Sequence, residues 1–324
     1  MNPKILIIRF SSFGDIVQSF ACVPELAEQG EIHYLTKESF GALPSLCSEI
    51  SQVHQFNPKL GLSGLIKLAL KLRKEKFQLV YDAHENPRSK IVRFIVTCFT
   101  STGLAIRSKS RWKRFQLFTL KKRNALPAPF KGMVSFCKPV GVNPSLQSWK
   151  FSRVIKPERL KELEEYCGQI ALVPSAAWDM KRWPSEHWQE LVRKLDHQSV
   201  VLGGPQDLFC QQISDQSSLS KNLSGKLSLV ESCYIVSKSK IVVSADTGLL
   251  HVADILGVPV IALIGPTAFG FPTFIKSKVL EMPMDCRPCT KDGRGKCSQP
   301  IWQQCMVDIS PRRVLEAINS NLPE

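Results

Sequence analysis

Short apolar runs and amphipathic stretches alternate along the first half of the chain. The run KILIIRF at 4–10 predicts a buried strand, and the pattern at 16–29 predicts a helix. A strand at 32–36, a helix at 61–76 and a strand at 77–84 follow in order. Strands that alternate with helices in this way indicate parallel pairing with crossover helices.

The second half repeats this alternation. Its first predicted elements are a helix at 157–167, a strand at 169–175, a helix within 183–195 and a strand at 199–204. The clearest unit is VVSADTGLLHVADILGVPVIALIGPT at 242–267, where two buried strands flank a helix that ends at Gly257. Its polar residues follow a strand directly, and ligands of open α/β sheets bind at the carboxyl ends of strands.

A stretch at 138–157 is rich in Pro, Gly and Ser and has little periodicity, so it predicts a linker. We therefore expect an α/β protein of two Rossmann-like domains, 1–150 and 151–324, whose parallel sheets face a cleft. The last predicted helix, 310–322, could pack on either domain. The length of 324 residues is sufficient for two cores of ordinary size.

Composition indicates a soluble globular protein, with 44% hydrophobic and 22% charged residues. The apolar run at the N-terminus is too short for the core of a signal peptide, and no stretch approaches a membrane span. We therefore expect a cytoplasmic protein. Most of the eleven cysteines stand alone in apolar or helical contexts, which favours reduced thiols over a disulfide framework.

The net charge of +15 is concentrated in residues 59–131, which contain 18 Lys or Arg and three acids. Basic residues alternate there with apolar ones at 61–76 and with aromatic ones at 107–123. Three interpretations stay open: a solvated face of ordinary helices, a surface for anionic lipid headgroups or a phosphorylated substrate, and a nucleic-acid surface. No nucleic-acid recognition motif accompanies the charge.

Candidate catalytic and binding residues follow predicted strands in both halves. In RFSSFGDIVQS, Gly14 suits a tight turn into a helix, and Asp15 is either the cap of that helix or an acceptor for a hydroxyl proton. In VPSAAWDMKRWP, Ser175 and the alanines after it allow a ligand near the backbone, and Lys181 offers a charge for phosphate.

The loop that follows the strand at 241–244 supplies a third group of candidates. The amides of the helix that begins near Thr247 and Gly248 form an anion site, and His251 shares their face. Asp246 would repel a phosphate placed directly on it, so a hydroxyl or backbone amides are its expected partners.

Six ordered motifs give the chain a strong resemblance to glycosyltransferase family 9, the lipopolysaccharide heptosyltransferases, nearer the heptosyltransferase II-like branch. The motifs are RFSSFGD, YDAHENPRS, VPSAAWDMKRWP, VVLGGP, NLSGKLSLVE and VVSADTGLLHVADILGVPVIALIGPT, and the match as a whole runs from residue 4 to about 313. The resemblance implies a GT-B fold, with an N-terminal acceptor-binding domain and a C-terminal nucleotide-sugar-binding domain.

The same resemblance implies an inverting, metal-independent transfer of heptose from ADP-L-glycero-D-manno-heptose to a sugar hydroxyl of the lipopolysaccharide inner core. Asp15 matches the aspartate taken as general base. The donor-binding positions are Ser175, Lys181, Asp246, Thr247, Gly248 and His251. Candidate acceptor contacts are Ser12, Gly14, Arg88 and Ser89, although Arg88 could equally be a surface ion-pair partner.

Partners and location follow from that reaction. They are an ADP-sugar donor, a lipid-anchored phosphorylated saccharide and the anionic inner-membrane surface, without nucleic acid. We expect a monomer that is peripheral on the cytoplasmic face of the inner membrane. No catalytic cofactor is implied. The chain departs from some members at Ala176 and Ala177, where those members have hydroxyl residues, and an acid that contacts the donor ribose has no clear counterpart.

Two other functions remain as alternatives. One is a basic, zinc-bearing nucleic-acid-binding protein, and the other is a GT-B transferase that uses another nucleotide-sugar. An NAD-dependent dehydrogenase is disfavoured because no G-x-G-x-x-G follows any predicted strand.

A cysteine-rich segment before the last helix has the spacing C-x2-C-x7-C-x7-C. Its members are Cys286, Cys289, Cys297 and Cys305. The spacing fits a structural four-thiolate zinc site, and reduced thiols or a disulfide are the alternatives.

Overall fold

The computed structural model describes residues 2–126 and 128–322, which form two compact units. The first contains residues up to 111 together with 133–154, and the second contains 112–132 and 155–324. The change of unit after Val154 lies close to the predicted boundary at 150. The structure differs from the predicted division at 112–132, which joins the second unit because Phe118 and Phe130 pack on Phe269 of that unit.

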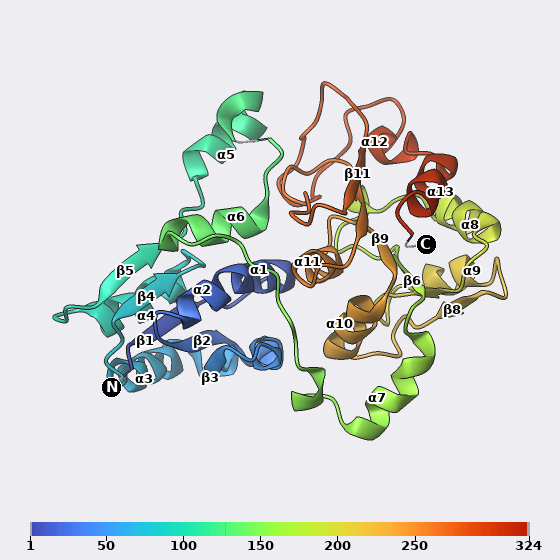
Figure 1. Cartoon of the computed structure of the whole chain (residues 1–324). Helices are drawn as coiled ribbons and strands as arrows, with labels where there is room; N and C mark the ends of the chain where they lie inside the picture. Colours follow the sequence, from blue (N-terminus) through green and yellow to red (C-terminus); the bar gives the residue numbers. More distant parts are fainter. Residues whose placement is uncertain (1, 127, 323–324) are drawn as a thin grey trace. The chain divides into compact units, whose positions relative to one another are not determined.

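The first unit is a five-stranded sheet in the order β3-β2-β1-β4-β5, with every strand parallel to its neighbours (Figure 1). The strands are β1 (Lys4–Ile8), β2 (Glu31–Lys37), β3 (Ile50–Phe56), β4 (Leu79–Asp82) and β5 (Gly103–Ile106). The helices are α1 (Phe13–Ser19), α2 (Val23–Ala27), α3 (Gly61–Arg73), α4 (Pro87–Thr97) and α6 (Gly132–Cys137), the last of which begins at the end of the second unit.

Alternation of side chains along the strands places helices on both faces of this sheet. On β2, Tyr34 meets Ser19 of α1 through a hydroxyl contact of 2.7 Å, whereas the next residue, Leu35, packs in the cluster that contains Leu65 of α3 and Val92 of α4. The predicted single helix at 16–29 is divided into α1, a 3-10 turn and α2, where a proline occupies the start of α2.

The second unit is a six-stranded parallel sheet in the order β11-β10-β9-β6-β7-β8. Numbered within the unit, this is the Rossmann order 3-2-1-4-5-6. Its strands are β6 (Ile170–Val173), β7 (Ser199–Val201), β8 (Ser220–Asn222), β9 (Ile241–Ala245), β10 (Val260–Ile264) and β11 (Lys278–Glu281). The helices are α5 (Arg111–Phe118), whose first residue is the last of the 2–111 segment of the first unit, α7 (Pro157–Leu163), α8 (Ser185–Lys194), α9 (Phe209–Ser214), α10 (Leu229–Lys238), α11 (Gly248–Ile255), α12 (Gln304–Val307) and α13 (Pro311–Asn319).

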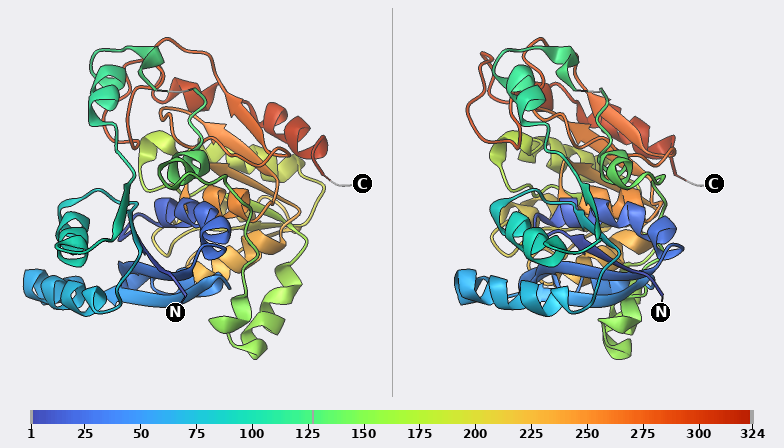
Figure 2. Two further views of the ribbon diagram at one scale, coloured as in Figure 1. Left: turned by 60° about the vertical axis from the view of Figure 1, so that its left-hand side comes forward. Right: turned by 90° about the vertical axis from the view of Figure 1, so that its left-hand side faces the viewer.

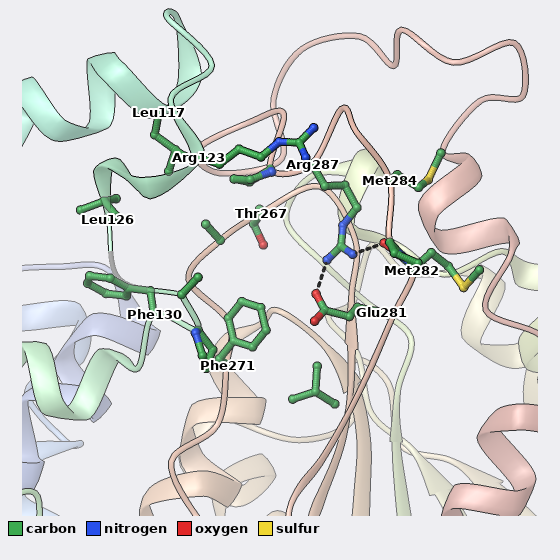
Figure 3. Close-up of a pocket in the computed structure, with 16 residues that line it drawn as sticks. Leu117, Arg123, Leu126, Phe130, Thr267, Phe271, Glu281, Met282, Met284 and Arg287 are labelled. Carbon is green, nitrogen blue, oxygen red and sulfur yellow. Dashed lines mark hydrogen bonds and ion pairs between the residues drawn. The ribbon is translucent and has the colours of Figure 1, made fainter.

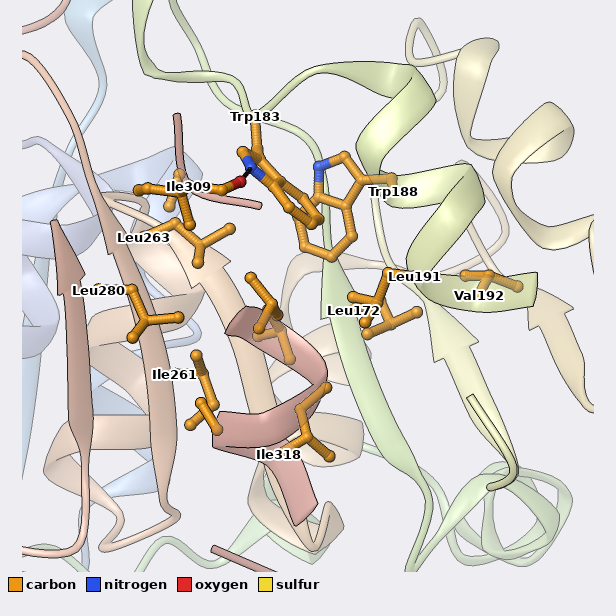
Figure 4. Packing of buried hydrophobic residues seen from close by; sticks show 14 of the residues in the cluster. Leu172, Trp183, Trp188, Leu191, Val192, Ile261, Leu263, Leu280, Ile309 and Ile318 are labelled. Carbon is orange, nitrogen blue, oxygen red and sulfur yellow. Dashed lines mark hydrogen bonds between the residues drawn. The ribbon is translucent and has the colours of Figure 1, made fainter. Parts of the chain in front are cut away.

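The last helix, α13, packs on the second unit, which decides between the two placements that the sequence left open. Its buried residues Val314 and Ile318 join a core cluster with Ile261 and Leu263 of β10. Trp183 closes the same cluster and donates its indole N–H to the carbonyl of Ile309 at 2.8 Å (Figure 4). The two further views in Figure 2 show α13, in red, next to the C-terminus. No helix in the described part of the chain is long and apolar enough to cross a membrane.

Candidate active site

The carboxyl ends of three neighbouring strands in the second unit supply one polar site. Val173 of β6 is in register with Ser244 of β9, and Ala245 of β9 is in register with Leu263 of β10. The loops that leave these strands therefore start side by side. They carry Lys181, Asp246 and Thr267 respectively.

Asp246 is the centre of this site. Its carboxylate Oδ2 lies 2.9 Å from Lys181 Nζ and accepts a hydrogen bond of 2.7 Å from the Thr267 hydroxyl. Its Oδ1 lies 3.7 Å from Nε2 of His251 on α11. Burial alone would raise the pKa of Asp246, but Lys181, His251 and Thr267 overcome that effect and hold it well below its ordinary value. Asp246 is therefore an ionised carboxylate that is partnered from three directions.

Helix α11 begins beside this carboxylate. Thr247 is its N-cap residue and Gly248 its first residue, and the Thr247 hydroxyl is 2.9 Å from that of Ser244. The helix ends at Ile255, close to the predicted end at Gly257, and Gly257 has a φ of 70°, the left-handed conformation that commonly follows a helix. Asp246 immediately precedes the N-cap of α11. The ammonium of Lys181, which comes from the loop after β6, therefore lies near the start of this helix, and this arrangement suits an anionic group.

Ser175 belongs to an adjacent cluster. Its hydroxyl donates to Asp207, which also accepts from the amide of Gly204 at 2.7 Å and lies 3.7 Å from Arg182. The structure thus places four of the other predicted donor residues next to Asp246, namely Lys181, Thr247, Gly248 and His251, and connects Ser175 to the loop after β7. Asp207 was not predicted, although it follows the glycines of VVLGGP.

The cysteine-rich segment supports the lysine loop. A Cβ added to Gly293 would lie 2.6 Å from Cγ of Lys181, and Arg294 covers the Trp178 ring at 4.5 Å. The side-chain amide of Gln303 donates to the carbonyl of Asp179. These contacts hold the stem of Lys181 in place. No local pattern could predict them, because the two segments are more than a hundred residues apart.

The structure does not gather the four cysteines of this segment into one group of metal ligands. In residues 2–126 and 128–322, no group of three or more His, Cys, Asp or Glu is placed to hold a metal. All four thiols are free. Burial raises the pKa of Cys289, and it raises the pKa of Cys305 to about 12, so both are protonated thiols at neutral pH. Of the three alternatives left by the sequence, this arrangement favours reduced thiols.

In the first unit, Asp15 lies at the carboxyl end of β1. It is the third residue of α1, and the N-cap position is occupied by Ser12. Its Oδ2 is 2.5 Å from Arg9 Nη2 and accepts a hydrogen bond of 2.7 Å from the Ser12 hydroxyl. Asp15 is therefore not the helix cap, and its orientation is fixed by two side chains. Gly14 lies inside the first turn and is not among the described glycines with positive φ, so the predicted tight turn does not occur there.

The buried guanidinium of Arg9 ties Asp15 to the neighbouring strand β4. Arg9 donates to the carbonyl of Ala83 at 2.7 Å, and the next amide, of Phe10, donates to Nδ1 of His84 at 3.1 Å. Burial, together with Arg9, lowers the pKa of His84 to about 3, so this imidazole is neutral. Burial and Arg9 also lower the pKa of Lys109. Neither Arg9 nor His84 was predicted as a site residue.

Ser89 and Arg88 differ in what they can contact. Ser89 is buried at the start of α4, where its hydroxyl donates to Asp82 at 3.0 Å and accepts from the amide of Asn86 at 2.9 Å. It forms a capping box with Asn86, so the predicted acceptor contact for Ser89 does not fit the structure. Arg88 is exposed, with its guanidinium 6.0 Å from the centre of the Phe56 ring.

Comparison with known proteins identifies the family. The model of glycosyltransferase family 9 (heptosyltransferase) matches residues 65–302. The chain belongs to this family. Lipopolysaccharide heptosyltransferase 2 of Escherichia coli K12 is 24% identical over 348 aligned positions, which cover 98% of each chain.

Solved structures of glycosyltransferase family 9 share the fold. The structure of the E. coli ADP-heptose heptosyltransferase II has a TM-score of 0.68 at 22% identity and covers 98% of both chains. That of the E. coli heptosyltransferase WaaC with ADP-2-deoxy-2-fluoro heptose has a TM-score of 0.66 at 20% identity and covers 98% of this chain and 99% of that one. The expected α/β fold of the GT-B type is thereby confirmed, and membership of this family does not support the nucleic-acid-binding alternative.

A pocket of about 720 Å³ in the second unit borders the polar site around Asp246 (Figure 3). Thr267, which binds Asp246, is one of its lining residues, and most of the others are apolar. Arg287 lines it too, but donates to the carbonyls of Gly265 and Ile264 and to Glu281. Arg123, the other arginine of the lining, pairs with Asp285 at 3.1 Å. Because the charges of both arginines are already engaged, the pocket is a poor place for a diphosphate.

The basic region 59–131 is divided between the two units. Residues 59–111 belong to the first and 112–131 to the second, so the region is not one surface of the N-terminal domain, as the sequence had suggested. The second part carries six Lys or Arg and no acid.

Proposed function

We propose that the chain transfers heptose from ADP-L-glycero-D-manno-heptose to a sugar hydroxyl of the lipopolysaccharide inner core. The observation that carries the proposal is the ionised Asp246–Lys181 pair, whose aspartate directly precedes the N-cap of α11, within a chain of glycosyltransferase family 9. Relatives with the same overall length are lipopolysaccharide heptosyltransferases, and one solved neighbour was determined with an ADP-heptose analogue.

In this proposal, Lys181 and the amides of Thr247 and Gly248 bind the diphosphate of the donor. Asp15 accepts the proton of the acceptor hydroxyl as the hydroxyl oxygen bonds to the anomeric carbon. The bond from that carbon to the diphosphate breaks in the same step, and its electron pair leaves with ADP, whose added charge Lys181 and the amides stabilise. One displacement inverts the anomeric carbon and requires neither a covalent intermediate nor a metal.

Arg9 and Ser12 fix the Asp15 carboxylate in one orientation, which a general base requires. Lys109, beside this group, supplies a charge for the phosphates of a phosphorylated acceptor. Arg88 remains a candidate contact for the same phosphates. We further propose that the protein acts as a monomer, peripheral on the cytoplasmic face of the inner membrane.

Asp15→Asn tests the role of the base. We expect about a 10³-fold loss of transfer, because general base catalysis contributes on that scale, with ADP affinity within twofold of the wild type. Glu28→Gln removes an exposed acid from the same unit and should leave both quantities unchanged. Transfer by Asp15→Asn at the wild-type rate would refute the assignment.

Two further measurements test the donor and the mechanism. In a panel of nucleotide-sugars, ADP-heptose should raise the melting temperature most, and a larger rise with another nucleotide-sugar would favour the remaining alternative. Full activity in EDTA and an inverted anomeric configuration in the product, followed by NMR, are the results expected of a metal-independent single displacement.

A further inference from the structure

The outer face of α3 carries an exposed line of aliphatic side chains. Leu62, Ile66 and Leu70 recur at i, i+4 and i+8, which places them on one side of the helix. They are 59%, 38% and 51% exposed. We call these three residues the aliphatic line.

This line is not needed for the core of the unit. A different side of α3, with Leu65, Ala69 and Leu72, is buried against the sheet and α4. Arg73 at the end of α3 also donates to the carbonyl of Ile95 of α4 at 2.7 Å, which fixes the two helices together. Figure 2 shows α3, in light blue, projecting at the lower left of both views. The fold therefore holds α3 by one side and leaves the aliphatic line in solvent.

A line of lysines runs beside the aliphatic line. Lys67 and Lys71 each follow one of its members, and Lys74 lies one turn further; all three are exposed. We call these three the lysine line. The neighbouring helix α4 adds the exposed Lys90 and the 67% exposed Phe94.

Acids do not offset these lysines. Within 59–111 the acids are Glu75, Asp82 and Glu85. Glu75 pairs with Lys4 at 2.6 Å, Asp82 is buried, and Glu85 accepts from the amide of Lys109 at 2.5 Å. The exposed side of α3 therefore presents positive charge next to aliphatic surface.

We propose that the outer face of α3 docks on an anionic lipid bilayer. The aliphatic line would enter the boundary between headgroups and acyl chains, and the lysine line would contact the lipid phosphates, as in interfacial amphipathic helices. A nucleic acid would use the lysines but would leave three aliphatic side chains in water. The biological use of this docking rests on the proposed function, whose acceptor is lipid-anchored, but the contact itself requires no substrate.

Co-sedimentation of the full chain with vesicles, without any sugar substrate, tests the docking. We expect stronger binding to phosphatidylcholine vesicles that contain phosphatidylglycerol than to phosphatidylcholine alone. Lys67→Gln, Lys71→Gln and Lys74→Gln together should weaken binding by about 100-fold, since each basic residue near the surface contributes about fivefold. Leu62→Gln, Ile66→Gln and Leu70→Gln together should weaken it by at least about tenfold.

A charge-matched control removes three exposed lysines from the second unit, as Lys221→Gln, Lys238→Gln and Lys240→Gln. It should bind vesicles like the wild type. Equal losses in this control and in the lysine-line variant would overturn the proposal, because net charge alone would then explain binding. Unchanged vesicle binding in the aliphatic-line variant would also overturn it, as would binding of the wild type to duplex DNA but not to vesicles.

Transfer to a water-soluble acceptor fragment separates this proposal from the proposed function. Both α3 variants should retain the wild-type rate on that fragment and lose rate only on vesicle-bound acceptor. A wild-type chain that docks on vesicles but transfers no heptose would refute the proposed function and leave docking supported. A wild-type chain that transfers heptose but shows no preference for anionic vesicles would overturn the docking and leave the function supported.

Discussion

Replacement of Asp246 by Asn tests whether its carboxylate is a buried charge that Lys181 requires. The variant keeps the shape of the side chain and removes its charge, while Lys181, whose side chain is only 15% exposed, keeps its own. Removal of one partner from a buried ion pair costs about 3–5 kcal/mol, mostly because the other charge stays behind. Because some water reaches this pair, we expect a loss near the lower limit, about 3 kcal/mol in the free energy of unfolding.

Urea denaturation measures this loss of unfolding free energy. It is followed by the fluorescence of Trp183 and Trp188, which lie in the core of the second unit. The double variant Asp246→Asn, Lys181→Met should be more stable than Asp246→Asn alone, because it removes the unpaired cation as well. Asp285→Asn is the matched control, since that acid pairs with Arg123 at 3.1 Å on the surface, and it should leave stability unchanged. If Asp246→Asn were as stable as the control, the buried-pair argument would be wrong.

The dependence of stability on pH gives a second readout of the same carboxylate. The pKa of Asp246 is well below its ordinary value in the folded chain, and about 3.9 in the unfolded chain. Its contribution is therefore present above the unfolded value and is lost as the pH falls toward the folded one. We expect Asp246→Asn to unfold with a weaker dependence on pH below about 4 than the wild type. An equally steep acid dependence in both proteins would contradict the lowered pKa.

Three further predictions concern neighbouring features. Gly270→Ala should weaken ADP binding in calorimetry, because its Cβ would lie 2.5 Å from that of Asp246, whereas Gly204→Ala, with a nearest neighbour at 3.3 Å, should have a smaller effect. Ser89→Ala should lower the free energy of unfolding by about 1–3 kcal/mol, because the buried Asp82 loses a hydrogen-bond donor. The same variant should leave the KM for the acceptor unchanged. A raised KM in a stably folded variant would show that Ser89 contacts the acceptor. Elemental analysis of protein purified without chelator should find far less than one zinc per chain, and a stoichiometric amount would show that the four cysteines rearrange around a metal.

Strands that are buried on both faces could be predicted from the sequence, since β1, β6, β9 and β10 consist almost entirely of apolar residues. The edge strand β3 (Ile50–Phe56) was missed because its pattern is mostly polar, and its burial depends on long-range packing. The start of α10 was also missed, although the capping box of Ser228 and Glu231 is visible in SLVE.

Individual site residues could be found from the sequence more readily than their pairing. Lys181 and Asp246 were both candidates because each follows a strand, but their contact depends on β6 lying next to β9, which no local pattern specifies. The prediction that residues 112–132 belong to the N-terminal domain differs from the structure for the same reason. The pattern of basic and apolar residues at 112–132 is compatible with either unit. The contacts with Phe269 that place this segment in the second unit are long-range.

An acid next to a phosphate-binding lysine weakens phosphate binding by charge repulsion. The geometry nevertheless assigns Asp246 a role in donor binding. An ammonium has three N–H donors, so Lys181 can hold a diphosphate oxygen without leaving Asp246. Asp246 and Gly293 already restrict the lysine stem, so less side-chain freedom is lost when the donor binds. We infer that Asp246 contributes to donor binding by placing Lys181 beside the first amides of α11, and that its repulsion of the diphosphate is offset by this preorganisation.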